Sequence, residues 1–311
     1  MDKINIVFAA DNNYAQHAAV AMVSVLKNTV NPAMVQFYLI ADELTADIKD
    51  KLVTTVNNLG SSLEFVTVKD TDLKNGYVSG NLTRAAYFRL DIPNILPAQV
   101  HKVIYLDCDV IVRKDIAELW NTELGETPLA AVADFGILAS TAKLREKEEH
   151  IGWTDSYSYF NSGVLILNLD QWRANNYSKK VLQLVETKKY RHHDQDALNE
   201  VFLGTWYQLP VKWNVIPPVY NMTLRVITNS KFRKEAVEAL KDIAIVHYAG
   251  GYKPWQYFSQ KGFNSLYYIY LEESAFKDAT MPQPGADQMK HSITRQIWRL
   301  RWACLCKKIL G

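Results

Sequence analysis

The chain has 311 residues, of which 48% are hydrophobic and 22% charged, and this composition excludes a mainly disordered protein while fitting one large α/β domain with appendages. Its net charge of +2 combines an acidic body, with 29 basic and 32 acidic residues, and a stretch from residue 287 that holds six Lys or Arg and one acid. No apolar run approaches the roughly 18 residues of a membrane span and no signal-peptide pattern opens the chain, so we expect a cytoplasmic protein.

Strand and helix patterns alternate at the start of the chain. Residues 4–10 and 35–40 are typical of buried strands, each followed by a helix pattern, and residues 63–68 supply a third strand. This order predicts a mixed, mainly parallel sheet with helices on both faces, whose ligands bind beyond the carboxyl ends of the strands. Neither a Gly-x-Gly-x-x-Gly nor a P-loop pattern follows the first strand, so a phosphate-bearing ligand needs another clamp.

Asp107 and Asp109 follow an apolar run at residues 103–106 that suits a strand buried on both faces. Side chains two positions apart in an extended segment point the same way, so one divalent cation is able to offset the repulsion and lost hydration of both carboxylates. Oxygen ligands favour Mg²⁺ or Mn²⁺, ions that commonly hold phosphates. The alternative is a capping turn before the helix pattern at residues 115–120, and the tripeptide alone leaves both interpretations equally open.

Two polar residues stand near other predicted elements. Residues 83–90 predict a helix, and a lone arginine in it such as Arg89 is more often a solvated surface residue than a ligand contact. Asn161 precedes a strand pattern at residues 164–169, and an amide beside a strand entrance is suited to hold a ligand hydroxyl.

A second polar cluster opens a helix pattern near residue 194. One of Asp194 and Asp196 suffices as an N-cap, so the other is left for a different role. We interpret the preceding pair, His192 and His193, as surface polar sequence. His247 ends the strand pattern that starts at residue 243, which is the same kind of position that the acids at residues 107 and 109 occupy.

The tail, residues 281–311, follows a Pro- and Gly-containing linker at 281–285. It predicts an amphipathic helix in which apolar and tryptophan side chains are interleaved with basic residues, as in helices that bind anionic membrane surfaces. A helix docked on the body is the structural alternative. Nucleic acid binding is disfavoured because no recognised fold accompanies the basic patch.

Five motifs occur in order along the chain: Phe-Ala-Ala-Asp-Asn-Asn-Tyr, Tyr-Leu-Asp-Cys-Asp, Phe-Asn-Ser-Gly-Val-Leu, Asp-Gln-Asp-Ala-Leu-Asn and His-Tyr-Ala-Gly-Gly-Tyr-Lys-Pro-Trp. Together they resemble the bacterial retaining glycosyltransferases of family 8, close to the lipooligosaccharide α-galactosyltransferases, with glycogenin as a distant relative. The resemblance implies a Rossmann-like domain of the GT-A type over residues 1–280, followed by the tail.

The resemblance also implies a UDP-hexose donor, Mn²⁺ with Mg²⁺ as a substitute, and transfer with retention of configuration. It implies metal ligation by Asp107, Asp109 and His247. It implies donor binding by Ala9, Asp11, Asn13, Tyr14, Arg89, Asn161, Gly250 and Lys253. It implies catalytic positions at Gln195, Asp194, Asp196 and Asp134.

We therefore expect a retaining hexosyltransferase, with galactose favoured as the donor sugar, that acts on a cell-surface glycolipid or lipopolysaccharide. It would work at the inner face of the cell membrane. Two alternatives remain: a glucosyltransferase of the same family, and a catalytically silent UDP-sugar-binding protein at the membrane surface. We favour attack on the same face from which UDP departs over a covalent intermediate on Asp196.

Overall fold

A computed structural model describes residues 3–41, 43–67, 88–152, 159–256 and 263–279. The predicted tail and most of the helix predicted at residues 83–90 lie outside the described residues. Within the described part of the chain, no helix combines the length and the apolar character that crossing a membrane requires.

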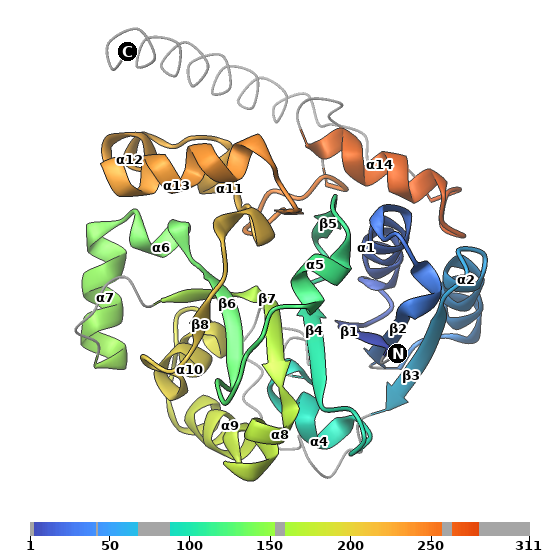
Figure 1. The fold of residues 1–311 in the computed structure, drawn as a ribbon, viewed down its shortest axis with the longest axis horizontal. Helices are drawn as coiled ribbons and strands as arrows, with labels where there is room; N and C mark the ends of the chain where they lie inside the picture. The colour runs from blue at the N-terminus through green and yellow to red at the C-terminus, as the bar shows by residue number, and fades with distance from the viewer. Residues whose placement is uncertain (1–2, 42, 68–87, 153–158, 257–262, 280–311) are drawn as a thin grey trace, which may run out of the picture.

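A mixed sheet forms the centre of the molecule (Figure 1). Across the described residues it has seven strands, in the spatial order β3 (Ser62–Thr67), β2 (Val35–Ala41), β1 (Ile4–Ala10), β4 (Lys102–Leu106), β7 (Phe160–Asn168), β6 (Leu129–Ala133) and β8 (Tyr207–Gln208). Pairing is parallel throughout except that β7 runs antiparallel to both β4 and β6. The predicted mixed, mainly parallel sheet is confirmed.

Both faces of the sheet are buried, because successive side chains of a strand point to opposite sides. In β1, Ile6 and Phe8 belong to one apolar cluster, which also contains side chains of α1, α13 and α14, whereas Val7 belongs to a second cluster with side chains of α8, α9 and α10. The near-continuous apolar runs of β1 and β4 are therefore a consequence of helices covering both faces.

The helices that build these two layers are α1 (Ala15–Asn28), α2 (Ala46–Asn57), α4 (Ile92–Ile95), α5 (Ile116–Trp120), α6 (Phe135–Leu138), α7 (Thr141–Ile151), α8 (Leu169–Ala174), α9 (Tyr177–Thr187), α10 (His193–Val201), α11 (Pro217–Tyr220), α12 (Leu224–Thr228), α13 (Ser230–Lys241) and α14 (Asn264–Glu272). Short 3₁₀ turns occupy Pro32–Met34, Arg89–Asp91 and Val211–Trp213.

A small second sheet stands beyond the carboxyl end of β4. Among the described residues it consists of β5 (Val110–Val112) and β9 (Ile245–His247), which pair antiparallel with Val110 opposite His247. The chain passes from β4 to β5 through residues 107–109. The last residue of β9 is thereby brought next to this short connection, although the two segments are far apart in sequence.

Candidate active site

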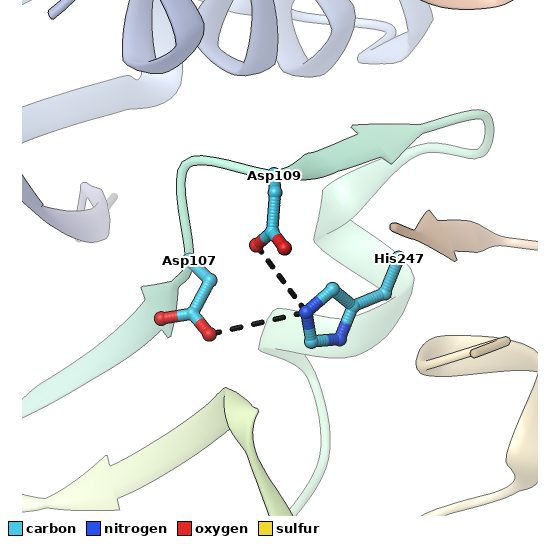
Figure 2. A group of neighbouring side chains, drawn as sticks. All are labelled: Asp107, Asp109 and His247. Carbon is cyan, nitrogen blue, oxygen red and sulfur yellow. Dashed lines mark ion pairs between the residues drawn. The ribbon is translucent and has the colours of Figure 1, made fainter. Parts of the chain in front are cut away.

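The side chains of Asp107, Asp109 and His247 converge at this junction (Figure 2). His247 Nε2 lies 3.3 Å from Asp109 Oδ1 and 3.9 Å from Asp107 Oδ2, and one ligand atom from each residue lies within 4.8 Å of the others. The helix α5 is capped by Asp115, whose Oδ1 accepts a hydrogen bond from Ala117 N. The capping-turn alternative for Asp107 and Asp109 is therefore wrong.

The environment of His247 fits a metal ligand. Its Nδ1 lies 2.8 Å from Asn214 Oδ1, and Asn214 Nδ2 in turn donates to Asn161 Oδ1 at 2.8 Å. Because the amide oxygen of Asn214 is an acceptor, Nδ1 donates its proton to it, and Nε2 is the ring nitrogen that faces the two carboxylates. Two carboxylate oxygens and one imidazole nitrogen form a donor set that could hold a divalent metal ion.

Lys253 adds a positive charge beside this donor set. Its ammonium donates to Asp109 Oδ2 and, at 2.9 Å, to Tyr248 O. Burial by itself raises the pKa of Asp109, but His247 and Lys253 outweigh that effect and hold the pKa well below its usual range. Asp109 is therefore a carboxylate at any physiological pH, ready to bind a cation.

Arg89 joins two of the predicted acids. Its Nη2 lies 3.0 Å from Asp107 Oδ1, its Nε lies 3.1 Å from Asp194 Oδ2, and its guanidinium stacks 4.8 Å from the centre of the Tyr105 ring. Burial raises the pKa of Asp194, and Arg89 opposes that shift. Arg89 is only 9% exposed, so the expectation from the lone-arginine pattern, a solvated surface residue, is wrong.

Gln195 lies at the centre of a hydrogen-bonded cluster. Its Nε2 donates to Asp134 Oδ2 at 3.0 Å, and its Oε1 accepts from Asn161 Nδ2 at 3.2 Å and from Ser162 N at 3.1 Å. The other carboxylate oxygen of Asp134 caps α6 by accepting from Gly136 N at 2.7 Å. Because a carboxylate only accepts and a backbone N–H only donates, the orientation of the Gln195 amide is fixed.

Asp196 lies next to this cluster but faces other partners. Its carboxylate accepts hydrogen bonds from Lys147 Nζ at 2.8 Å, His192 N at 2.9 Å and the Tyr159 hydroxyl at 2.6 Å. His192 Nδ1 lies 2.8 Å from Lys147 Nζ, and the His192 side chain is 32% exposed, so this histidine is partly at the surface and also contacts the buried lysine. Neither acid at residues 194 and 196 caps α10 with its side chain from the N-cap position, which His192 occupies.

The turn after β1 lies at the same edge of the sheet as residues 107–109, beyond the carboxyl ends of β1 and β4. Tyr14 contacts Trp255 edge-on, with ring centres 6.3 Å apart, and Trp255 stacks on His17 at 3.6 Å. Asp11 Oδ1 accepts from Tyr14 N at 2.9 Å, and its Oδ2 accepts from Asn13 Nδ2 at 3.5 Å. The remaining predicted positions of this side are Ala9 at the end of β1, the exposed Asn13, and Gly250, whose φ is +91°.

The structure thus brings the predicted ligand residues to one edge of the sheet and adds residues that sequence patterns did not indicate. Asn214 orients His247, while Lys147 and Tyr159 contact Asp196. Lys147 belongs to a helix rich in charged residues, where a buried lysine has no distinguishing pattern. Asn214 follows a buried tryptophan in an irregular segment, so only its three-dimensional contacts identify it.

Comparisons with known proteins agree with this geometry. The profile of the family described as Glycosyl transferase family 8 matches residues 5–259. The chain is 31% identical over 290 residues to General stress protein A of Bacillus subtilis (strain 168), covering 92% of this chain and 98% of the relative. It is 27% identical over 278 residues to a lipopolysaccharide 1,2-glucosyltransferase of Escherichia coli (strain K12), covering 88% and 79%.

Among solved structures, the chain resembles the galactosyltransferase LgtC in complex with donor and acceptor sugar analogs. The TM-score is 0.74 and the sequence identity 27%, over 90% of this chain and 98% of that one. The similarity therefore extends over most of this chain.

Proposed function

Because this chain belongs to glycosyl transferase family 8 and is therefore a glycosyltransferase, we propose that it transfers a hexose from a UDP-sugar to a lipopolysaccharide or another cell-surface glycolipid, with retention of configuration. The observation that carries the proposal is the cluster of Asp107, Asp109 and His247, with Lys253 beside it and the Gln195 cluster next to it. Similarity to a lipopolysaccharide glucosyltransferase and to a galactosyltransferase supports the acceptor and donor classes.

The diphosphate of the donor would lie against the cationic side of the site. Asp107, Asp109 and His247 would hold Mn²⁺, which when bound would neutralise the charge that develops on UDP as the glycosidic bond breaks. Lys253 would add a second positive charge to the same leaving group, and Gly250 would let the backbone of its loop approach a phosphate closely.

The nucleoside would lie in the turn after β1. Asp11 would accept hydrogen bonds from the uracil edge, with Ala9, Asn13 and Tyr14 forming the pocket around it. The Tyr14 ring, held edge-on by Trp255, supplies a flat apolar surface of the kind on which a base stacks.

The sugar would be held by residues near the end of β7. Arg89, Asn161 and Asp194 would bind its hydroxyl groups, with Asp134 on the acceptor side and the Gln195 amide close to the anomeric carbon. Because the Asp196 carboxylate is committed to three donors, we favour attack by the acceptor on the face from which UDP leaves. A glycosyl adduct trapped on Asp196 of the unmodified enzyme would overturn this mechanism.

The donor sugar is the finer part of the proposal. We favour galactose over glucose, two sugars that differ only at C4, where one or two hydrogen bonds decide the preference. Hydrolysis of UDP-galactose and of UDP-glucose, each with Mn²⁺ and with Mg²⁺, is expected to be fastest for UDP-galactose with Mn²⁺. A silent UDP-sugar-binding protein would bind UDP without turning over either donor, and that result would refute the enzymatic proposal.

We further propose that the tail attaches the protein to the inner face of the cell membrane. The support is its composition, six basic residues interleaved with apolar and tryptophan side chains, which suits an anionic lipid surface. Deletion after Gly285 should release the protein from anionic vesicles in a flotation assay, and continued binding would contradict the proposal.

A further inference from the structure

A lysine ammonium is enclosed behind the Gln195 cluster. Lys147 projects from α7 and is 1% exposed, and its Nζ contacts Asp196 Oδ2 and His192 Nδ1, both at 2.8 Å. A buried ammonium loses the hydration that it had in water, so its burial lowers stability unless its charge is paired and hydrogen-bonded. The nearer charge partner is Asp196, which is 2% exposed and directly follows Gln195, while Glu146 Oε1 lies 3.6 Å from the ammonium.

The Asp196 carboxylate also accepts a hydrogen bond from a tyrosine. Its Oδ1 accepts the proton of the Tyr159 hydroxyl at 2.6 Å, while Oδ2 is held by Lys147 and the backbone of His192. Burial raises the pKa of Tyr159 well above its usual value, with the neighbouring Asp196 adding to the shift, so the phenol keeps its proton. A hydroxyl has one proton, so the Tyr159 oxygen faces its remaining neighbours as an acceptor.

One of those neighbours is the Gln195 amide. Gln195 Nε2 donates to the Tyr159 oxygen at 3.1 Å as well as to Asp134, which leaves Oε1 directed towards Ser162 N and Asn161. Without Lys147, Asp196 Oδ2 would lose the ammonium that lies 2.8 Å from it, and the carboxylate could shift relative to the Tyr159 hydroxyl. The Gln195 amide would then lose one of the two acceptors that hold its Nε2 in place.

We propose that Lys147 is a positioning residue for hexose transfer: by holding the Asp196 carboxylate, it keeps the Tyr159 oxygen in place as the second acceptor of the Gln195 amide, beside Asp134, and so keeps that amide in position. The inference rests on the proposed function, in which Gln195 lies beside the anomeric carbon. It assigns to α7, a helix outside the sheet edge, a role in the rate of transfer, and it gives Lys147 no contact with the donor.

The first test compares Lys147→Met with Arg145→Met, which removes a positive charge from an exposed position of the same helix. Calorimetric titration with UDP and Mn²⁺ gives the number of intact sites and the Kd, and transfer assays give kcat per intact site. Lys147→Met should lower kcat per site by about 10-fold to 100-fold, as small misplacements in active sites do, with Kd and donor KM within about twofold of wild type. Arg145→Met should match wild type in all four quantities.

A merely structural role for Lys147 would give a different pattern. The number of intact sites would fall while kcat per intact site stayed at the wild-type value, and that outcome would overturn the inference. Wild-type kcat per site in a fully folded Lys147→Met variant would do the same. Failure of the unmodified protein to turn over any UDP-hexose would instead count against the proposed function.

The second test uses Tyr159→Phe, which removes the hydroxyl that links Asp196 to Gln195 and leaves the buried charges paired. Tyr159→Phe should also lower kcat per site with little change in Kd. In the double variant with Lys147→Met, the loss of kcat should not exceed, within error, the loss in the less active single variant, since both substitutions act through one chain of hydrogen bonds. Additive losses, or a wild-type rate for Tyr159→Phe, would overturn the inference. Tyr159→Phe alone decides the matter if Lys147→Met cannot be purified.

Discussion

Gly163 allows Asp107 and His247, two of the proposed metal ligands, to approach one another, and replacing it by alanine is the most direct test of the site. A Cβ built at this position would lie 2.7 Å from Asp107 Oδ2 and even closer to His247 Cε1. Both approaches are shorter than ordinary van der Waals contact, so at least one ligand has to move. The strain is steric and concerns these two side chains, because Gly163 lies in the regular strand β7.

The two neighbours differ in their ability to move. His247 is 3% exposed and tied to Asn214 through Nδ1, so it has no space to retreat into. The Asp107 side chain is 23% exposed, and moving it outward would break its contact with Arg89 and separate it from Asp109. Overpacking of this kind costs about 1–3 kcal/mol of stability, and disturbing a metal ligand in this way lowers metal affinity by about 10-fold to 100-fold.

The assay is calorimetric titration of Gly163→Ala with Mn²⁺, with a thermal melt in EDTA as the measure of stability. Gly251→Ala is the matched control, since a Cβ at that glycine would have no heavy atom within 4 Å. We expect the control to bind Mn²⁺ like wild type and Gly163→Ala to bind it at least about 10-fold more weakly. Wild-type Mn²⁺ affinity in Gly163→Ala would refute the reasoning.

Three further predictions concern Asp109, His17 and Lys147. Asp109→Asn should abolish Mn²⁺-dependent turnover and leave the circular dichroism spectrum unchanged, and undiminished turnover would remove this residue from the metal site. Burial lowers the pKa of His17 to about 3, so the unfolded chain takes up a proton that the folded chain does not between about pH 6.5 and 3. The free energy of unfolding should therefore fall as the pH falls through 6.5, by about 2 kcal/mol at pH 5. Urea unfolding at pH 7.5 and 5 should show a smaller loss in His17→Gln than in wild type. Lys147→Met should lower the free energy of unfolding by about 3–5 kcal/mol, because it leaves a buried carboxylate without its ammonium partner. Adding Asp196→Asn should restore part of the lost melting temperature, and a further drop in melting temperature would contradict the ion-pair explanation.

The sheet and its edge were predictable because their signals are local. The apolar runs at residues 4–10 and 103–106 are long enough to mark buried strands, and β1 and β4 occupy Ile4–Ala10 and Lys102–Leu106. The order of parallel strands then predicts, from the sequence alone, that Asp107 lies at a carboxyl edge of the sheet. The antiparallel course of β7 was not predictable, because a strand buried on both faces has the same composition in either direction.

The predictions at the site failed where a residue's role depends on contacts across the fold. An arginine in a short helix is usually solvated, and only the packing of Arg89 between Asp107 and Asp194 makes it a buried cross-link. Asn214 and Lys147 likewise gain their roles from partners in other elements. No pattern in the neighbouring sequence distinguishes such residues from ordinary polar surface.

The pairing of β5 with β9 has a consequence for biosynthesis. Asp107 and Asp109 leave the ribosome with the first strands, but His247 reaches them only when β9 has been made and has paired with β5. A nascent or truncated chain that contains β1 to β5 therefore holds the two carboxylates without their imidazole partner. Because such long-range pairing forms late, metal binding at the proposed site would report that the chain has been synthesised and folded at least as far as β9.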